Sequence, residues 1–149
     1  MSNTDTEIDP SKSTTTSTLR VRFCETDLMG IVHHATYLVY FEAGRVEWLR
    51  RRGITYADWT ARGVHVPVAT ADLQYRAPSR FDDVLAIETT LAKVRAVSLD
   101  FTYRIRRDDT LIAEGKTRLA CVDGATKLLR IPEEIRSALL QGERQGGRD

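Results

Sequence analysis

Apolar and polar residues alternate along most of the second half of the chain. The alternation is clearest over residues 85–91 and 99–105, and a further strand is predicted over 111–122. A period of two indicates strands that bury one face. Because short turns such as 107–109 join these segments, we expect neighbouring strands to pair antiparallel.

Two more strands are predicted closer to the N-terminus. Leu19, Val21 and Phe23 alternate with polar or small residues, which indicates a strand over 19–24. Residues 64–75 also alternate, but the apolar positions change parity within this segment. That change predicts a β-bulge near residues 69–71.

Residues 35–52 have the period of an amphipathic helix. Its predicted apolar face contains Tyr37, Leu38, Phe41, Gly44, Trp48 and Leu49. Gly44 is either a point of close approach to the sheet or a glycine without a special role. Glu42 and Arg45 are predicted off this face, at a spacing suited to a surface ion pair or a contact between subunits. Gly53 then ends the helix.

The remaining elements complete an α+β domain. Thr55 and Asp58 predict the start of a short helix that ends near Gly63, and Pro132 is predicted at the first position of a C-terminal helix. One curved antiparallel sheet wrapped around one long central helix follows from this order. We expect a disordered tail over 1–17, one domain over 18–141 and a flexible tail over 142–149. The uncovered sheet edges favour a homo-oligomer.

Composition and charge exclude several classes of protein. Hydrophobic residues make up 42% of the chain, charged residues 29%, and the net charge is +1, so no nucleic-acid partner is expected. We expect no transmembrane segment, because no apolar run approaches about 20 residues. The start of the chain lacks a signal peptide's apolar core, which predicts a cytoplasmic location. Cys24 and Cys121 have no metal-ligand spacing, and no disulfide is expected between them.

Residues 25–37 hold the densest group of chemically capable side chains. They connect a strand to the start of the long helix, where free N–H groups and the helix dipole favour negative charge. Asp27 precedes this helix start, and Gly30 gives the loop freedom to turn. Asp27 is therefore either a catalytic carboxylate or an ordinary turn and cap residue. We expect no metal at His33 and His34, since adjacent side chains in a helix or strand point apart, and no cofactor.

An extended set of residues resembles the 4-hydroxybenzoyl-CoA thioesterase family of hotdog proteins. The resemblance is strongest to the branch of short-chain acyl-CoA thioesterases that includes the Tol-Pal-associated enzyme, and it covers about residues 18–135. The residues that carry it are Glu25, Thr26, Asp27, Gly30, His34, Tyr37, Phe41, Glu42, Arg45, Pro78, Phe81, Asp82, Asp83, Arg95, Ser98, Cys121, Val122 and Asp123.

The resemblance implies a role for several of these positions. Asp27 matches the catalytic aspartate, and the backbone N–H of His34 matches the group that polarises the thioester carbonyl. Arg95 and Ser98 match a turn that contacts CoA. His33 stands where relatives have an aromatic residue and is predicted, with Tyr37, to line the substrate pocket. The hotdog fold implies a five-stranded sheet and at least a dimer, with a tetramer expected as a dimer of dimers.

The predicted function is hydrolysis of a short-chain or aromatic acyl-CoA to the free acid and CoA. A thiolate leaves readily because thiols have a pKa of about 8.5. Asp27 then acts either as a general base for water or as a nucleophile, and the residues leave both routes open. The alternatives are a non-catalytic acyl-CoA-binding or regulatory module and a hydratase or dehydratase.

Overall fold

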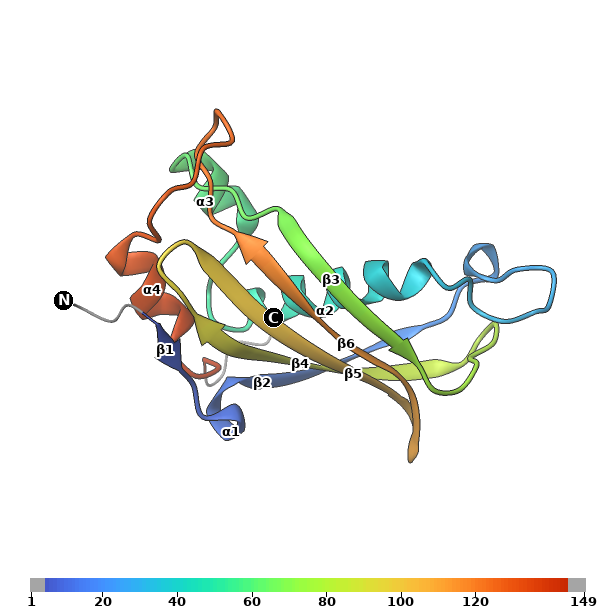
Figure 1. Cartoon of the computed structure of the whole chain (residues 1–149). Helices are drawn as coiled ribbons and strands as arrows, with labels where there is room; N and C mark the ends of the chain where they lie inside the picture. Colours follow the sequence, from blue (N-terminus) through green and yellow to red (C-terminus); the bar gives the residue numbers. More distant parts are fainter. Residues whose placement is uncertain (1–4, 145–149) are drawn as a thin grey trace.

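The strands belong to one antiparallel sheet, and the helices lie on one side of it or at its ends (Figure 1). The computed structural model describes residues 5–144. Its elements are β1 (Thr6–Glu7), α1 (Pro10–Ser13), β2 (Thr14–Arg20), η1 (Phe23–Glu25), α2 (Thr36–Arg50), α3 (Tyr56–Ala61), β3 (Val68–Tyr75), β4 (Val84–Val94), β5 (Ser98–Arg107), β6 (Thr110–Ala120) and α4 (Glu133–Leu139).

The five long strands are arranged in the order β2-β4-β5-β6-β3, and every neighbouring pair is antiparallel. The two-residue strand β1 continues the β2 edge by pairing with the end of β4. The prediction of a five-stranded antiparallel sheet is therefore confirmed. The β3 and β6 registers shift between Val68 and Thr70, which confirms the predicted bulge.

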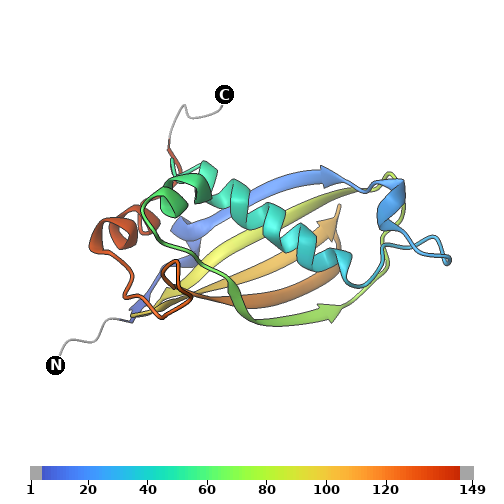
Figure 2. The ribbon, with the colours of Figure 1, turned by 90° about the horizontal axis from the view of Figure 1, so that it is seen from above.

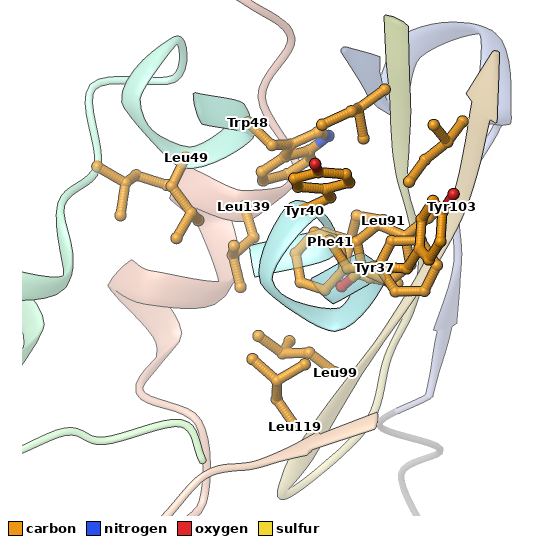
Figure 3. Close-up of a cluster of buried hydrophobic side chains, with 14 of the residues drawn as sticks. Tyr37, Tyr40, Phe41, Trp48, Leu49, Leu91, Leu99, Tyr103, Leu119 and Leu139 are labelled. Carbon is orange, nitrogen blue, oxygen red and sulfur yellow. The ribbon is translucent and has the colours of Figure 1, made fainter. Parts of the chain in front are cut away.

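Helix α2 crosses the concave face of the curved sheet (Figure 2). Aromatic side chains make much of the contact between the helix and the sheet (Figure 3). Phe41 stacks on Tyr103 with ring centroids 4.2 Å apart, and Trp48 meets Phe101 edge to face at 5.4 Å. The predicted apolar face is buried except for Leu38, which is 41% exposed. This is the hotdog arrangement that the family resemblance implied.

Gly44 allows α2 to approach the sheet closely. A Cβ atom at this position would lie 2.4 Å from Thr89 Oγ1 and 2.9 Å from Ile87 Cγ2, both on β4. Real Cβ contacts are longer than this, so a side chain here requires the helix or the strand to move. Of the two interpretations of Gly44, close backbone approach is the one that the packing supports.

The N-terminal segment differs from the predicted tail over 1–17. Residues 1–4 lie outside the described part, but β2 already begins at Thr14, and Ser13 and Thr15 are buried. The Ser13 hydroxyl donates to Leu91 O at 3.0 Å, and its carbonyl accepts from the Trp48 indole at 2.7 Å. The polar composition of this Ser- and Thr-rich segment predicted a tail. In the structure, its hydroxyl groups hydrogen-bond to residues that are distant in sequence.

The strand predicted over 19–24 is also displaced. It ends at Arg20, and Phe23–Glu25 forms a single 3-10 turn. Val21 is buried as the alternation requires, but Phe23 is 76% exposed and packs edge to face on Phe81 at 5.7 Å. The chain leaves the sheet here to enter the loop that carries Asp27.

The other predicted elements agree with the structure, with small changes at their ends. Thr55 caps α3 by accepting the Asp58 N–H, and Gly53 ends α2 with a φ of 76°. Pro132 is the N-cap of α4 rather than its first residue. Residues 145–149 of the predicted C-terminal tail lie outside the described residues, whereas the Arg144 N–H donates to Arg51 O at 2.9 Å.

Candidate active site

Asp27 lies in a tight turn at one end of the molecule, in the loop between β2 and α2 (Figure 1). Its carboxylate accepts the Met29 N–H at 2.8 Å, and its carbonyl accepts the Gly30 N–H at 2.9 Å. Gly30 has a φ of 79°, a conformation that favours glycine. The turn therefore fixes the position of the Asp27 side chain while leaving it exposed to solvent within one protomer.

Glu25 attaches this loop to the central helix. Its carboxylate accepts the Tyr40 hydroxyl and the Arg22 N–H, each at 2.8 Å, and its carbonyl accepts the His33 N–H at 2.8 Å. Burial opposes ionisation of Glu25, but the hydrogen bonds from Arg22 and Tyr40 outweigh it and lower the pKa of the carboxyl group. Glu25 had no predicted role of its own, because its partner Tyr40 is 15 positions away in the sequence.

The start of α2 leaves one backbone donor available. The Ala35 N–H donates to His33 Nδ1 at 3.1 Å, and the Thr36 N–H donates to His33 O at 2.9 Å. The His34 N–H makes no hydrogen bond with any of residues 5–144. A free N–H at the positive end of a 15-residue helix is suited to holding a negatively charged oxygen.

The two histidines are closer than we predicted. Their rings stack with centroids 4.1 Å apart, because residues 33–35 form a turn rather than regular helix or strand. Both side chains are exposed. His33 acts as a local cap for Ala35, which ties its imidazole to the helix start.

A pocket of about 470 Å³ brings Asp27, His34 and Tyr37 together. Its other lining residues are Ile31, Val32, Tyr75, Arg76, Ala77 and Pro78. The Tyr37 hydroxyl is hydrogen-bonded to Ser79 Oγ at 2.7 Å, and burial raises the pKa of this phenol. Asp27 and His34 thus line one pocket, and acyl transfer needs a carboxylate and an oxyanion donor at a common volume.

Two polar residues of the pocket, Tyr75 and Arg76, were not identified as site residues from the sequence. Tyr75 and Arg76 lie at the end of the edge strand β3 and in the segment that follows it. The Tyr75 hydroxyl donates to His34 O at 3.0 Å, which joins this strand to the helix start. Alternation placed Tyr75 on a strand, but only the tertiary fold brings the end of β3 beside α2.

Three predicted contacts do not line this pocket within one protomer. His33 faces His34 instead. Arg95 and Ser98 lie at the β4–β5 turn, at the opposite end of the sheet from Asp27 in both views (Figures 1 and 2). Arg95 forms ion pairs with Asp100 at 2.9 Å and with Asp5 at 3.5 Å.

Within residues 5–144 there is no group of three metal-ligating side chains. In the same range, no helix has the length and apolar character needed to span a bilayer. Cys24 is exposed and Cys121 is buried, and both are free thiols.

A model of the thioesterase-like superfamily matches residues 21–139. An acyl-CoA thioester hydrolase, YbgC of Escherichia coli, is 37% identical over 106 residues, covering 70% of this chain and 79% of that protein. A putative esterase of Aquifex aeolicus is 34% identical over 120 residues, covering 80% and 93%. The crystal structure of a hypothetical protein from Thermus thermophilus superimposes with a TM-score of 0.80 at 44% identity, covering 85% and 95%.

Proposed function

Because this chain belongs to the thioesterase-like superfamily, we propose that it hydrolyses an acyl-CoA to the free acid and CoA at the Asp27 pocket. The single observation that carries this proposal is that one pocket is lined by Asp27 and by His34, whose N–H has no hydrogen-bond partner among residues 5–144. The relatives named as acyl-CoA thioester hydrolases support the choice of substrate. A cytoplasmic location stays a prediction from the sequence.

In this proposal, the His34 N–H holds the thioester oxygen. The oxygen gains negative charge as the carbonyl is attacked, and a donor at the helix start stabilises that charge. Asp27 either removes a proton from the attacking water or attacks the carbonyl itself to form an anhydride that water then cleaves. In both routes the CoA thiolate departs without a strong acid, because a thiol has a pKa of about 8.5.

The remaining site residues have proposed binding roles. Tyr37, whose hydroxyl is hydrogen-bonded to Ser79, is proposed to line the substrate pocket. His33, whose ring stacks on His34, stays a proposed substrate contact. Arg95 and Ser98 stay proposed CoA contacts. Because they lie at the far end of the sheet from Asp27, they would contact CoA bound to the site of a different copy.

A homodimer formed through β3 is part of the proposal. β3 is an edge strand whose side chains are nearly all exposed, including Val68 at 46% and Tyr75 at 52%. An exposed edge readily pairs with another strand, and twofold pairing of identical edges closes the assembly. The outer face of the sheet also exposes polar residues such as Thr102 and Lys116, on which two dimers would stack to give the tetramer.

The test is release of free thiol from a panel of short-chain and aromatic acyl-CoAs by the full chain and by Asp27→Asn. An Asn side chain keeps the oxygen that accepts the Met29 N–H, so the turn should persist. We expect kcat to fall by about 10² to 10⁴ for loss of the carboxylate. Asp109→Asn, at an exposed position in the β5–β6 turn, is the matched control. Tight acyl-CoA binding without thiol release would favour the non-catalytic binding module instead.

A further inference from the structure

Arg45 carries a buried positive charge that has no carboxylate partner among residues 5–144. Its side chain points inward from α2 rather than toward Glu42, so the predicted surface ion pair is wrong, and the residue is only 5% exposed. Its guanidinium donates to the Tyr103 hydroxyl at 3.1 Å and to the Tyr56 hydroxyl at 3.4 Å. It forms no ion pair with any of residues 5–144. Buried charges are normally paired, because an unpaired one is strongly unfavourable.

A second pocket, of about 490 Å³, opens beside Arg45. Its polar lining residues are Glu42, Arg45, Tyr56, Thr60, His65, Asp123 and Thr126. Apolar walls come from Val64, Val66 and Val68, among others. The Arg45 Nη2 atom has no hydrogen-bond partner within the described part of the chain, and the Tyr56 hydroxyl, which accepts from Arg45, still has its own proton to donate. Two donors thus remain for a ligand in this pocket.

The two pockets occupy opposite ends of the same pair of elements. The Asp27 pocket lies at the start of α2 and at Tyr75 of β3, whereas the Arg45 pocket lies further along α2 and at Val68 of β3. Within one protomer, His34 and Arg45 are separated by roughly 16 Å along the helix axis. If two copies pair antiparallel through β3, the Tyr75 end of one strand meets the Val68 end of the other. Each Asp27 pocket then adjoins the Arg45 pocket of the second copy.

We propose that the Arg45 pocket binds a carboxylate at the far end of the acyl group, so that the substrates are acyl-CoAs of dicarboxylic acids. This inference rests on the proposed function and on the β3 dimer. The carboxylate would neutralise the Arg45 charge and accept hydrogen bonds from Nη2 and from the Tyr56 hydroxyl. Glu42 and Asp123 also line this pocket, and both repel an anion. Glu42 is exposed, so the substrate carboxylate is placed at the inner end of the pocket, beside Arg45.

The test compares two six-carbon substrates that differ only in the terminal group, adipoyl-CoA and hexanoyl-CoA. We expect the full chain to hydrolyse adipoyl-CoA with a kcat/KM at least about tenfold higher, equivalent to about 1.4 kcal/mol. Arg45→Met should abolish this preference, mainly by raising KM for adipoyl-CoA, and Arg45→Lys should retain part of it. Equal use of the two substrates, or an Arg45→Met variant that loses both activities in the same proportion, overturns the proposal.

A binding measurement separates this inference from the proposed function. Calorimetric titration of the full chain with adipate and with hexanoate needs no hydrolysis. Adipate binding that is lost in Arg45→Met supports the carboxylate site even if no thioester is cleaved, in which case only the proposed function fails. Absence of adipate binding overturns the site even if hexanoyl-CoA is hydrolysed. If Arg45→Met does not fold, Tyr56→Phe replaces it, and we expect this variant to weaken adipate binding because one donor is removed.

Discussion

The Tyr75 hydroxyl donates a hydrogen bond of 3.0 Å to the carbonyl of His34, which links the edge strand β3 to the start of α2. The peptide bond between His34 and Ala35 lies at the start of α2. The N–H of His34 is the donor of the candidate site that has no hydrogen-bond partner among the described residues. Tyr75 also packs edge to face against Tyr37, with ring centroids 5.8 Å apart. The position of the proposed oxyanion donor therefore depends on a side chain from the sheet edge.

Tyr75→Phe should reduce kcat with little change in stability. The phenol of Tyr75 is half exposed, so losing its hydrogen bond should cost no more than about 1 kcal/mol of unfolding free energy. Loss of the restraint on His34 should lower kcat by roughly tenfold or less, since about 1.4 kcal/mol of transition-state stabilisation corresponds to that factor. Steady-state kinetics and thermal unfolding measure the two effects. An unchanged kcat would show that the hydroxyl has no positioning role.

Gly44→Ala should destabilise the protein, although alanine favours helices. The added Cβ would stand 2.4 Å from Thr89 Oγ1. Overpacking of this kind costs about 1–3 kcal/mol, which exceeds the helix preference of about 1 kcal/mol. Urea unfolding of the single variant and of Gly44→Ala combined with Thr89→Ala tests the cause, because the second change removes the hydroxyl. Thr89→Ser keeps that oxygen, and rescue by it would argue against this clash.

Glu25→Gln should make stability less sensitive to acid. The pKa of Glu25 in the folded protein lies below 4.5, the usual value for a glutamate side chain. Its contribution is thus fully present above pH 4.5 and is lost as the pH falls through the lowered folded pKa. Melting temperatures at neutral pH and below pH 4.5 measure this, and the variant should lose more stability at neutral pH than in acid. The same change at exposed Glu133 is the control, and an equal effect there would count against a specific role for Glu25.

Thr15→Val tests whether the N-terminal segment belongs to the core. The Thr15 hydroxyl accepts from Arg52 Nη1 at 2.7 Å and donates to Glu143 at 2.6 Å. Arg52 is buried over the Trp48 ring, and its Nη2 atom has no hydrogen-bond partner in the described part of the chain. Arg52 Nη1 also donates to Trp48 O at 3.0 Å, so Thr15→Val leaves one of its two N–H groups without an acceptor. That loss in a buried site should cost about 1–3 kcal/mol.

Urea unfolding measures that cost. Thr16→Val, at the exposed neighbouring position of β2, should change stability by no more than about 0.5 kcal/mol. Equal effects at the two positions would mean that the buried contacts of Thr15 contribute nothing specific.

The local pattern of residues determined most of the elements. Period-two alternation located β4, β5 and β6, and helical period located α2, because side-chain burial repeats with the geometry of each element. The parity change before Leu73 located the bulge. The family resemblance and the position of Asp27 before a helix start identified the candidate site. Apart from the family resemblance, which covers about residues 18–135, these features depend on residues that are close together in the sequence.

Contacts between distant residues were decided only by the tertiary structure. The Thr-rich strand β2 was predicted to be part of a tail because its composition is polar. Composition does not reveal that its buried hydroxyl groups bond to Arg52 and Glu143. Arg45 looked like a surface charge until the fold placed two tyrosine hydroxyls beside it. Burial of a polar group is tolerated only where partners satisfy it, and those partners come from other elements of the chain. A pattern along the sequence predicts which face of a helix or strand a side chain lies on, whereas the tertiary structure determines which groups that side chain contacts.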